Sequence, residues 1–291
     1  MLGDGRIAAD TKEANLGCLR AALRCISTIC FVLATTGAVL AETSQEAFKP
    51  VVGQEGKDVV WVPTPPKLVE KMLDMAAVTP KDYVIDLGSG DGRNVIAAAK
   101  RGARALGVEY NPHMVELSSR AAAAEGVADK ATFVRGDMYD ADISQATVVA
   151  LFLLPENLRK LTPKFLELRP GTRIVANHFA IDGWDADETE RTDGECPSWC
   201  TALLYIVPAK VAGAWRLPQG ELTLEQKFQR VSGTLTSGAT SAPIEHGRVR
   251  ADQISFSVNG TDYVGRVNGD VMQVDVKGSA SERWTATRAR P

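Results

Sequence analysis

The sequence predicts an α/β fold, a doubly wound and mostly parallel sheet, followed by a small all-β barrel or meander domain. Two observations support this prediction. Between residues 83 and 177, short apolar strands alternate with helices, which is typical of βαβ units in a parallel sheet. From about residue 208 onward, helical periodicity gives way to apolar–polar alternation interrupted by Asn-Gly turns, which indicates antiparallel hairpins.

The composition is that of a folded globular protein. The 291 residues are 45% hydrophobic and 24% charged, which argues against a disordered chain, a collagen-like repeat or a membrane protein with many spans. The formal net charge is −3, whereas a nucleic-acid-binding domain is normally strongly basic. We therefore expect no nucleic-acid partner.

The first 41 residues have the pattern of a signal peptide. Arg20 and Arg24 precede an uncharged apolar run over residues 25–40, and Val39-Leu40-Ala41 resembles a cleavage site before Glu42. The run is short for a membrane-spanning helix, which needs about 20 apolar residues. Residues 1–41 are thus predicted to be a signal peptide or an N-terminal anchor, and the protein to be exported, either periplasmic or membrane-anchored.

Cysteine usage is consistent with export. Three of the five cysteines lie in the leader, and the other two, Cys196 and Cys200, are four residues apart in a polar loop. In an oxidising compartment such a pair can close a small disulfide, which would pin the loop of Trp184 and Asp185 against a strand expected over residues 202–207. A zinc site would need a second Cys/His pair, which His113, His178 and His246 do not supply. We expect no metal.

The α/β part is predicted to contain four helices and five strands. In chain order they are a helix over 67–75, strand 83–87, helix 94–101, strand 105–109, helix 113–125, strand 132–134, strand 147–153, helix 158–168 and strand 172–177.

Local signals set the limits of these elements. The prolines of residues 63–66 precede the first helix, whose apolar residues recur at helical spacing. Gly102 ends the second helix, and Asn111 with Pro112 begins the third. Pro163 is a signal that could break or restart the last helix.

The C-terminal part is predicted to hold five to seven short strands over residues 210–291. Apolar residues alternate over 222–228, 254–258, 263–267 and 272–276. Five aromatic side chains fall at strand spacing, and we expect them in the core, the alternative being a ligand site inside the barrel: Trp215, Phe228, Phe256, Tyr263 and Trp284. The preceding domain spans 67–209, and residues 42–66 form a linker.

A glycine-rich turn follows the first predicted strand. Gly88, Gly90 and Gly92 let the backbone approach a ligand closely and adopt positive φ. Ligands of such sheets bind at the carboxyl ends of the strands, and the helix N-terminus behind the turn favours an anionic group. However, Asp86 stands two residues before the first glycine, where a carboxylate would repel a pyrophosphate and suits a ligand with an ammonium group.

Residues 86–93, Asp-Leu-Gly-Ser-Gly-Asp-Gly-Arg, resemble motif I of class I S-adenosylmethionine-dependent methyltransferases. The resemblance implies a Rossmann-like methyltransferase sheet with S-adenosyl-L-methionine as cofactor. It also implies that Glu109, followed by Tyr110, accepts hydrogen bonds from both ribose hydroxyls. Asp137 would accept from the adenine amino group while Met138 packs on the ring.

The segment Val-Pro-Thr-Pro at residues 62–65 is similar to one in small protein-lysine methyltransferases of mitochondria and their bacterial relatives. This resemblance implies that residues 42–66 form a lid over the cofactor, with Trp61 and Thr64 near its methionine end. The alternative is a proline-rich entry to the first helix and no more.

The fourth strand ends in Phe-Leu-Leu-Pro-Glu-Asn over residues 152–157, where this superfamily usually places its substrate-facing motif. The Asn/Asp-Pro-Pro-Tyr signature is absent, which disfavours an amide or exocyclic-amine substrate. We expect Glu156 to orient a lysine ammonium and Asn157 to hydrogen-bond it, or Asn157 only to cap the next helix. Trp184 and Asp185 lie in a long loop expected to cover the site.

These expectations combine into a methyltransferase that moves a methyl group from S-adenosylmethionine to a protein lysine amine. Two alternatives remain: a small-molecule methyltransferase, and a catalytically idle exported protein that binds through its β domain. Because S-adenosylmethionine is a cytosolic cofactor, a cytoplasmic location is the alternative to export.

Overall fold

The computed structural model describes residues 48–192, 196, 198–218, 220–277 and 283–289. The predicted signal peptide lies outside the described residues. In the part of the chain that is described, no helix is both long and apolar enough to cross a membrane.

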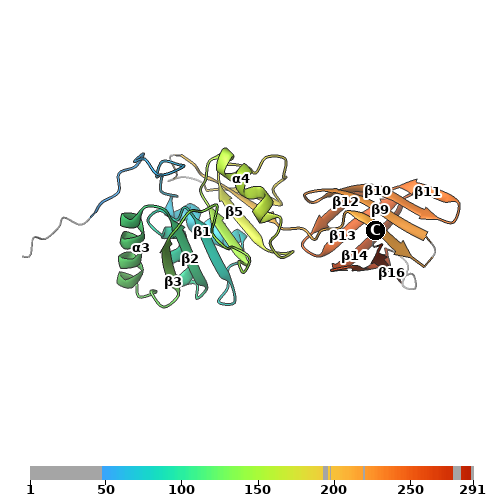
Figure 1. Cartoon of the computed structure of the whole chain (residues 1–291), viewed down its shortest axis with the longest axis horizontal. Helices are drawn as coiled ribbons and strands as arrows, with labels where there is room; N and C mark the ends of the chain where they lie inside the picture. The colour runs from blue at the N-terminus through green and yellow to red at the C-terminus, as the bar shows by residue number, and fades with distance from the viewer. Residues whose placement is uncertain (1–47, 193–195, 197, 219, 278–282, 290–291) are drawn as a thin grey trace, which may run out of the picture. The chain divides into compact units, whose positions relative to one another are not determined.

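The first sheet is doubly wound, as predicted, with its strands in the order β3-β2-β1-β4-β5-β7-β6. Figure 1 labels β3, β2, β1 and β5 of this sheet. The strands are β1 (Tyr83–Leu87), β2 (Arg104–Glu109), β3 (Ala131–Arg135), β4 (Val148–Leu151), β5 (Arg173–Asn177), β6 (Glu188–Arg191) and β7 (Thr201–Ile206). The first five are parallel, and β7 runs antiparallel to both of its neighbours. The strand order reverses between β1 and β4, and ligands of such sheets bind in the crevice at that point.

Helices cover both faces of this sheet. They are α1 (Pro66–Met75), α2 (Arg93–Lys100), α3 (Pro112–Ala124) and α4 (Pro155–Phe165). One hydrophobic core joins α1, α2 and α3 to side chains such as Val84 and Val148, and a second joins α4 to Ile85 and Val149. Because successive side chains of a strand point to opposite faces, neighbouring residues of one strand enter different cores.

Most predicted limits agree with the structure within one or two residues, but α4 begins at Pro155 instead of residue 158 and ends at Phe165 instead of residue 168. Proline fits the first turn of a helix, where its missing N–H needs no partner. Pro163 lies inside α4, close to its C-terminal end, and does not break it. The strand β6 was not predicted, because its short polar sequence at the sheet edge has no apolar alternation.

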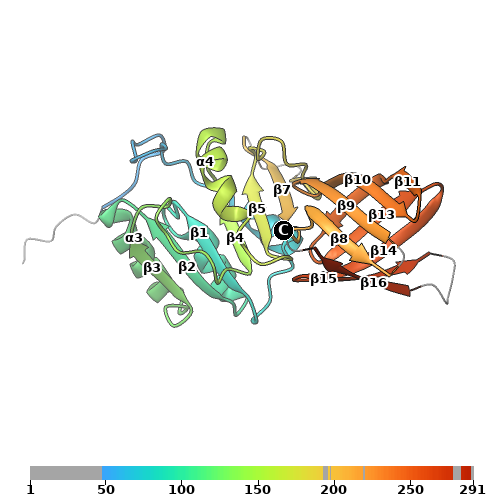
Figure 2. The same ribbon diagram turned by 45° about the vertical axis from the view of Figure 1, so that its right-hand side comes forward.

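The second sheet is an antiparallel barrel, which confirms the predicted class (Figure 2). Its strands are β8 (Gly213–Leu217), β9 (Gly220–Lys227), β10 (Arg230–Ser237), β11 (Thr240–Pro243), β12 (Glu245–Arg250), β13 (Gln253–Val258), β14 (Thr261–Asn268), β15 (Val271–Val276) and β16 (Arg283–Arg288). Pairing of β9 with β10 closes eight of them into a ring, and β11 pairs with β10 alone. The described residues of this domain thus form nine strands where five to seven were expected.

The barrel core contains three of the five predicted aromatic side chains, Trp215, Phe256 and Trp284, and Tyr263 packs half-buried against it. The prediction for Phe228 was wrong. Phe228 lies in the turn between β9 and β10 with φ +54°, and its ring stacks on that of Trp184, 5.2 Å between centroids. The apolar–polar alternation of the sequence therefore continues one residue beyond the end of β9 at Lys227.

Candidate active site

A pocket opens at the carboxyl ends of β1, β2 and β4, where the strand order reverses. It encloses about 890 Å³, open mouth included. All nine predicted cofactor-binding residues line it: Trp61, Thr64, Asp86, Gly88, Gly90, Glu109, Tyr110, Asp137 and Met138. Segments from four separate parts of the chain thus meet at one site.

The glycine-rich turn passes close to the segment predicted to be a lid. Gly88 has φ +73° and Gly90 has φ +55°, a region that side chains other than glycine rarely adopt. A Cβ atom on Gly90 would lie 2.7 Å from Nε1 of Trp61, so this position needs a glycine for space as well as for conformation. Trp61 is held in turn by a backbone hydrogen bond to Gln54, 2.9 Å long.

Glu109 at the end of β2 is fixed by two backbone amides. Its Oε2 accepts from the N–H of Gly90 and its Oε1 from the N–H of Asn111, both at 2.9 Å. An ionised carboxylate has about four acceptor positions, so both oxygens keep capacity for a vicinal diol. The geometry therefore suits a ribose.

Asp86 at the end of β1 is almost fully buried. Its Oδ2 accepts a hydrogen bond from Asn94 Nδ2 at 3.0 Å. Burial raises the pKa of this carboxyl to about 7, and the nearby charges of Glu109 and Asp91 raise it further against the opposing effect of Asn94. A cationic ligand would offset these penalties, as an ammonium group does.

Asp137, after β3, already holds a partner that the sequence did not reveal. Lys57, from the segment before α1, pairs with Oδ2 of Asp137, while Oδ1 accepts from the N–H of Tyr139 at 2.9 Å. The hydrogen bond from Lys57 lowers the pKa of Asp137. Lys57 Nζ also lies 5.1 Å from the ring centre of Tyr110. Nothing in the local sequence links residue 57 to residue 137.

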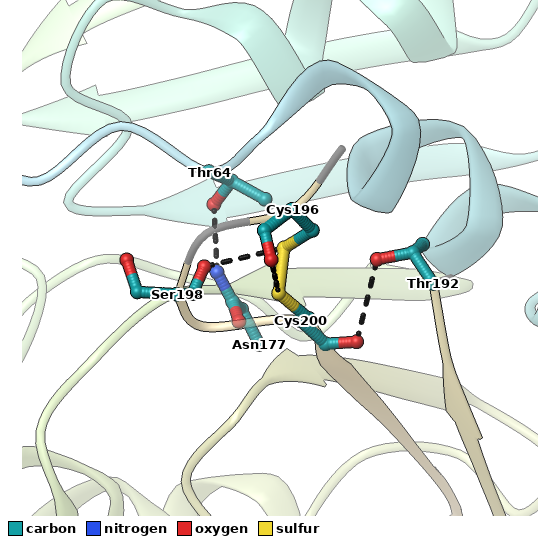
Figure 3. Close-up of a disulfide and its surroundings, with 6 residues drawn as sticks. All are labelled: Thr64, Asn177, Thr192, Cys196, Ser198 and Cys200. Atoms are coloured by element: carbon teal, nitrogen blue, oxygen red, sulfur yellow. Dashed lines mark hydrogen bonds between the residues drawn. A yellow bond between two sulfur atoms is a disulfide. The ribbon is translucent and has the colours of Figure 1, made fainter. Parts of the chain in front are cut away.

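Arg93 connects the glycine-rich turn to the Val-Pro-Thr-Pro segment. Its guanidinium pairs with Asp91 and donates to the backbone oxygen of Thr64. The Oγ1 of Thr64 accepts from Asn177 Nδ2 at 3.3 Å, as Figure 3 shows. Asn177 Oδ1 is buried and has no hydrogen-bond partner among the described residues. The segment is thus tied to the ends of both β1 and β5.

The predicted catalytic pair, Glu156 and Asn157, does not line the pocket. Both lie in the first turn of α4, where the Glu156 side chain is 64% exposed and pairs with Lys160 at 3.4 Å. Asn157 is buried and donates from Nδ2 to the Tyr139 hydroxyl at 2.8 Å. It does not cap α4, because the N-cap residue is Leu154.

The loop of Trp184 and Asp185, which was expected to cover the site, does not lie over the pocket. Trp184 is buried against Tyr205 and Phe228, and Asp185 pairs with Arg230 of the barrel. Neither lines the pocket.

The predicted bridge between Cys196 and Cys200 is present, with 5.7 Å between the Cα atoms (Figure 3). It closes the turn before β7 and not the loop of Trp184, from which β6 separates it. Within the described ranges, no group of three or more His, Cys, Asp or Glu side chains is arranged to hold a metal ion.

These residues fit S-adenosylmethionine. The buried carboxyl of Asp86 would hold the ammonium of the cofactor, Glu109 its ribose, and Asp137 with Met138 its adenine. When bound, S-adenosylmethionine supplies a methyl group on a sulfonium that a nucleophile can displace.

Comparisons with known proteins agree with this geometry. The family model of the ANTKMT methyltransferase domain matches residues 86–188. A protein-lysine N-methyltransferase of Saccharolobus islandicus is 42% identical over 153 residues, which cover 51% of this chain and 94% of that protein. The adenine nucleotide translocase lysine N-methyltransferase of Mus musculus is 34% identical over 128 residues, 43% of this chain and 56% of that protein. The chain thus matches nearly all of the first relative and little more than half of the second.

A solved structure described as an RNA methyltransferase from Salinibacter ruber, in complex with S-adenosyl-L-homocysteine, is 42% identical. The match covers 52% of this chain and 96% of that one, with a TM-score of 0.48. The likeness to the Saccharolobus protein extends over almost its whole length. The chain therefore belongs to the protein-lysine N-methyltransferase family of S-adenosylmethionine-dependent methyltransferases.

Proposed function

We propose that this protein methylates lysine side chains of a protein acceptor with S-adenosylmethionine as the methyl donor. The observation that carries the proposal is the 42% identity to a protein-lysine N-methyltransferase over 94% of that relative. The pocket adds support, because it gathers carboxylates suited to the ammonium, the ribose and the adenine of the cofactor.

The reaction is an in-line displacement. The lysine amine, after its proton has left to solvent, attacks the methyl carbon, and the new N–C bond forms as the S–C bond breaks. The electron pair of that bond stays on sulfur, which becomes a neutral thioether. Asp86 and Glu109 would hold the ammonium and the ribose of the donor, so the chain would contribute mainly alignment and exclusion of water.

The test is transfer of label from radiolabelled S-adenosylmethionine to a lysate by the full chain, followed by acid hydrolysis of the labelled protein. We expect label in methylated lysine, and its loss in a Glu109→Ala variant, whose carboxylate no longer bridges Gly90 and Asn111. Label in RNA or in a small molecule would contradict the proposal.

We also propose that the protein is exported. The leader pattern of residues 1–41 and the Cys196–Cys200 bridge support this, since disulfides persist mainly in oxidising compartments. Fractionation of cells that express a C-terminally tagged chain tests it. A species of full length in the cytosol would contradict export.

A further inference from the structure

Four aromatic rings gather at the carboxyl ends of β4 and β5, and we call them the aromatic cluster: Phe152, His178, Phe179 and Trp199. Trp199 lies next to the other three rings. The centroid of its ring is 4.7 Å from that of His178, 5.5 Å from that of Phe179 and 6.2 Å from that of Phe152. Its members come from three separate loops, so no local sequence pattern links them.

The aromatic cluster leads from the pocket to the surface. Phe152 lines the cofactor pocket, whereas His178 is exposed and Trp199 retains 37% of its surface. Soluble proteins normally keep tryptophan more covered than this. A row of rings that begins at the pocket wall and ends in solvent is suited to a long side chain that enters from outside.

The disulfide and the backbone hold Trp199 in place. Trp199 lies inside the five-residue loop that Cys196 and Cys200 close, and its φ of +59° is rare for a bulky residue. The Cys200 carbonyl accepts from Thr192 N–H at 3.0 Å, and His178 N–H donates to the Thr201 carbonyl at 2.7 Å. The disulfide and these hydrogen bonds therefore keep Trp199, whose backbone is strained, beside the C-terminal end of β5 and the N-terminal end of β7.

We propose that the aromatic cluster is the entry site for the acceptor lysine, with Trp199 as its main contact. This inference rests on the proposed function. The methylene groups of a lysine side chain pack on aromatic rings, and its ammonium is attracted to a ring face. Each added methyl group leaves the ammonium larger and less hydrated, and aromatic surroundings bind methylated ammonium groups well. The cluster would therefore retain a partly methylated lysine for further transfer.

A binding experiment tests the site without relying on activity. The full chain is labelled with 15N-tryptophan and titrated with Nα-acetyl-Nε-trimethyllysine amide or with its neutral analogue, in which a tert-butyl group replaces trimethylammonium. A Trp199→Phe variant assigns the indole signal of Trp199. Trp215, buried in the barrel core, is the internal control.

We expect the Trp199 signal to shift and to saturate at roughly tenfold lower concentration of the cationic probe than of the neutral one, as cation–π contacts predict. The Trp215 signal should stay in place. No shift at Trp199, or equal responses to both probes, would overturn the entry site. The proposed function fails separately, if the wild-type chain methylates something other than lysine.

Kinetics give a second readout. A Trp199→Ala variant should raise KM for the acceptor protein about tenfold, leave cofactor affinity unchanged within twofold, and lower the share of higher methylation states. Trp199→Phe should restore most of the loss. An unchanged KM, or an equal loss of cofactor affinity, contradicts the inference. Val271→Ala, at an exposed apolar position of β15, is the matched control.

Discussion

Asp86 is a buried carboxyl at the point where we expect the ammonium of the cofactor. Because burial raises its pKa to about 7, against 3.8 in water, the folded chain holds a proton there that the unfolded chain has lost. Between pH 3.8 and about pH 7 the folded state binds more protons than the unfolded state. The contribution of Asp86 to the free energy of unfolding therefore falls as pH rises through this range.

This titration makes cofactor binding pH-dependent. Only ionised Asp86 pairs with an ammonium, so the association constant for S-adenosylmethionine should rise about tenfold from pH 5.5 to pH 7, with proton release. Calorimetry in buffers of different ionisation enthalpy measures both the association constant and the number of protons released. An Asp86→Asn variant should bind more weakly and lose the pH dependence. If it keeps the same profile, another group titrates.

We expect Lys57 and the cofactor to compete for Oδ2 of Asp137, with which Lys57 pairs. The Lys57 ammonium pairs with the carboxylate that we expect to accept from adenine, and this pair is partly exposed. A Lys57→Met variant should therefore bind S-adenosylmethionine roughly threefold more tightly, in line with the small size of exposed ion pairs. Calorimetry of both proteins tests this. Lys81→Met changes an exposed lysine outside the pocket lining and should have no effect.

At the scale of elements, Asp82 fastens the turn before β1 to the neighbouring strands. It accepts from Thr79 N–H and Thr147 Oγ1, both at 2.8 Å, and pairs with Arg173 of β5. Burial raises the pKa of Asp82, but these hydrogen bonds outweigh it and lower the pKa below its usual value. A lowered pKa stabilises the fold at neutral pH, and this stabilisation is lost as pH falls below the unfolded value of 3.8.

Replacement of Asp82 should therefore destabilise the sheet. We expect Asp82→Ala to lower the free energy of unfolding by about 3 kcal/mol at pH 7, because it leaves polar partners unpaired. Urea titration followed by circular dichroism measures it. Asp74→Ala removes a carboxylate that is 67% exposed and pairs with Arg101, and it should cost under about 1 kcal/mol. Similar losses in the two variants would contradict this account.

At the scale of the whole molecule, the state of the disulfide indicates whether the chain folds in an oxidising compartment. Cys196 and Cys200 lie 5.7 Å apart between Cα atoms, so no backbone movement is needed for the bond. Protein taken from its own compartment, alkylated without reductant and digested, should yield the linked peptide and no alkylation at either position. Two alkylated cysteines would contradict the bridge and weaken the case for export.

The same bridge should contribute modestly to stability. Its loop is short, so a double Cys196→Ser, Cys200→Ser variant should lose less than the ~3 kcal/mol expected for a 15-residue loop. We expect the thermal midpoint to fall slightly and the acceptor KM to rise, as the Trp199 loop loses its constraint. A larger loss of stability would mean that the bridge supports more than this loop.

The sequence by itself determined the order of elements and the cofactor side of the pocket. Residues 83–87 could be identified as a strand, and Asp86, Glu109 and Asp137 as the pocket acids, since strand ends of a parallel sheet meet at one edge. Period-two alternation likewise identified the barrel as an all-β domain. These signals act over a few residues, where backbone geometry and hydrophobic periodicity are local.

Only the tertiary structure decided which distant groups meet. It paired Lys57 with Asp137, placed Glu156 in solvent, moved Phe228 from the barrel core to Trp184, and gathered Phe152 with Trp199. The contacts of Lys57, Phe228 and Phe152 join segments that are far apart in the sequence, and no local periodicity encodes them. They follow from how the sheets, helices and loops pack, because side-chain contacts depend on the positions of whole elements.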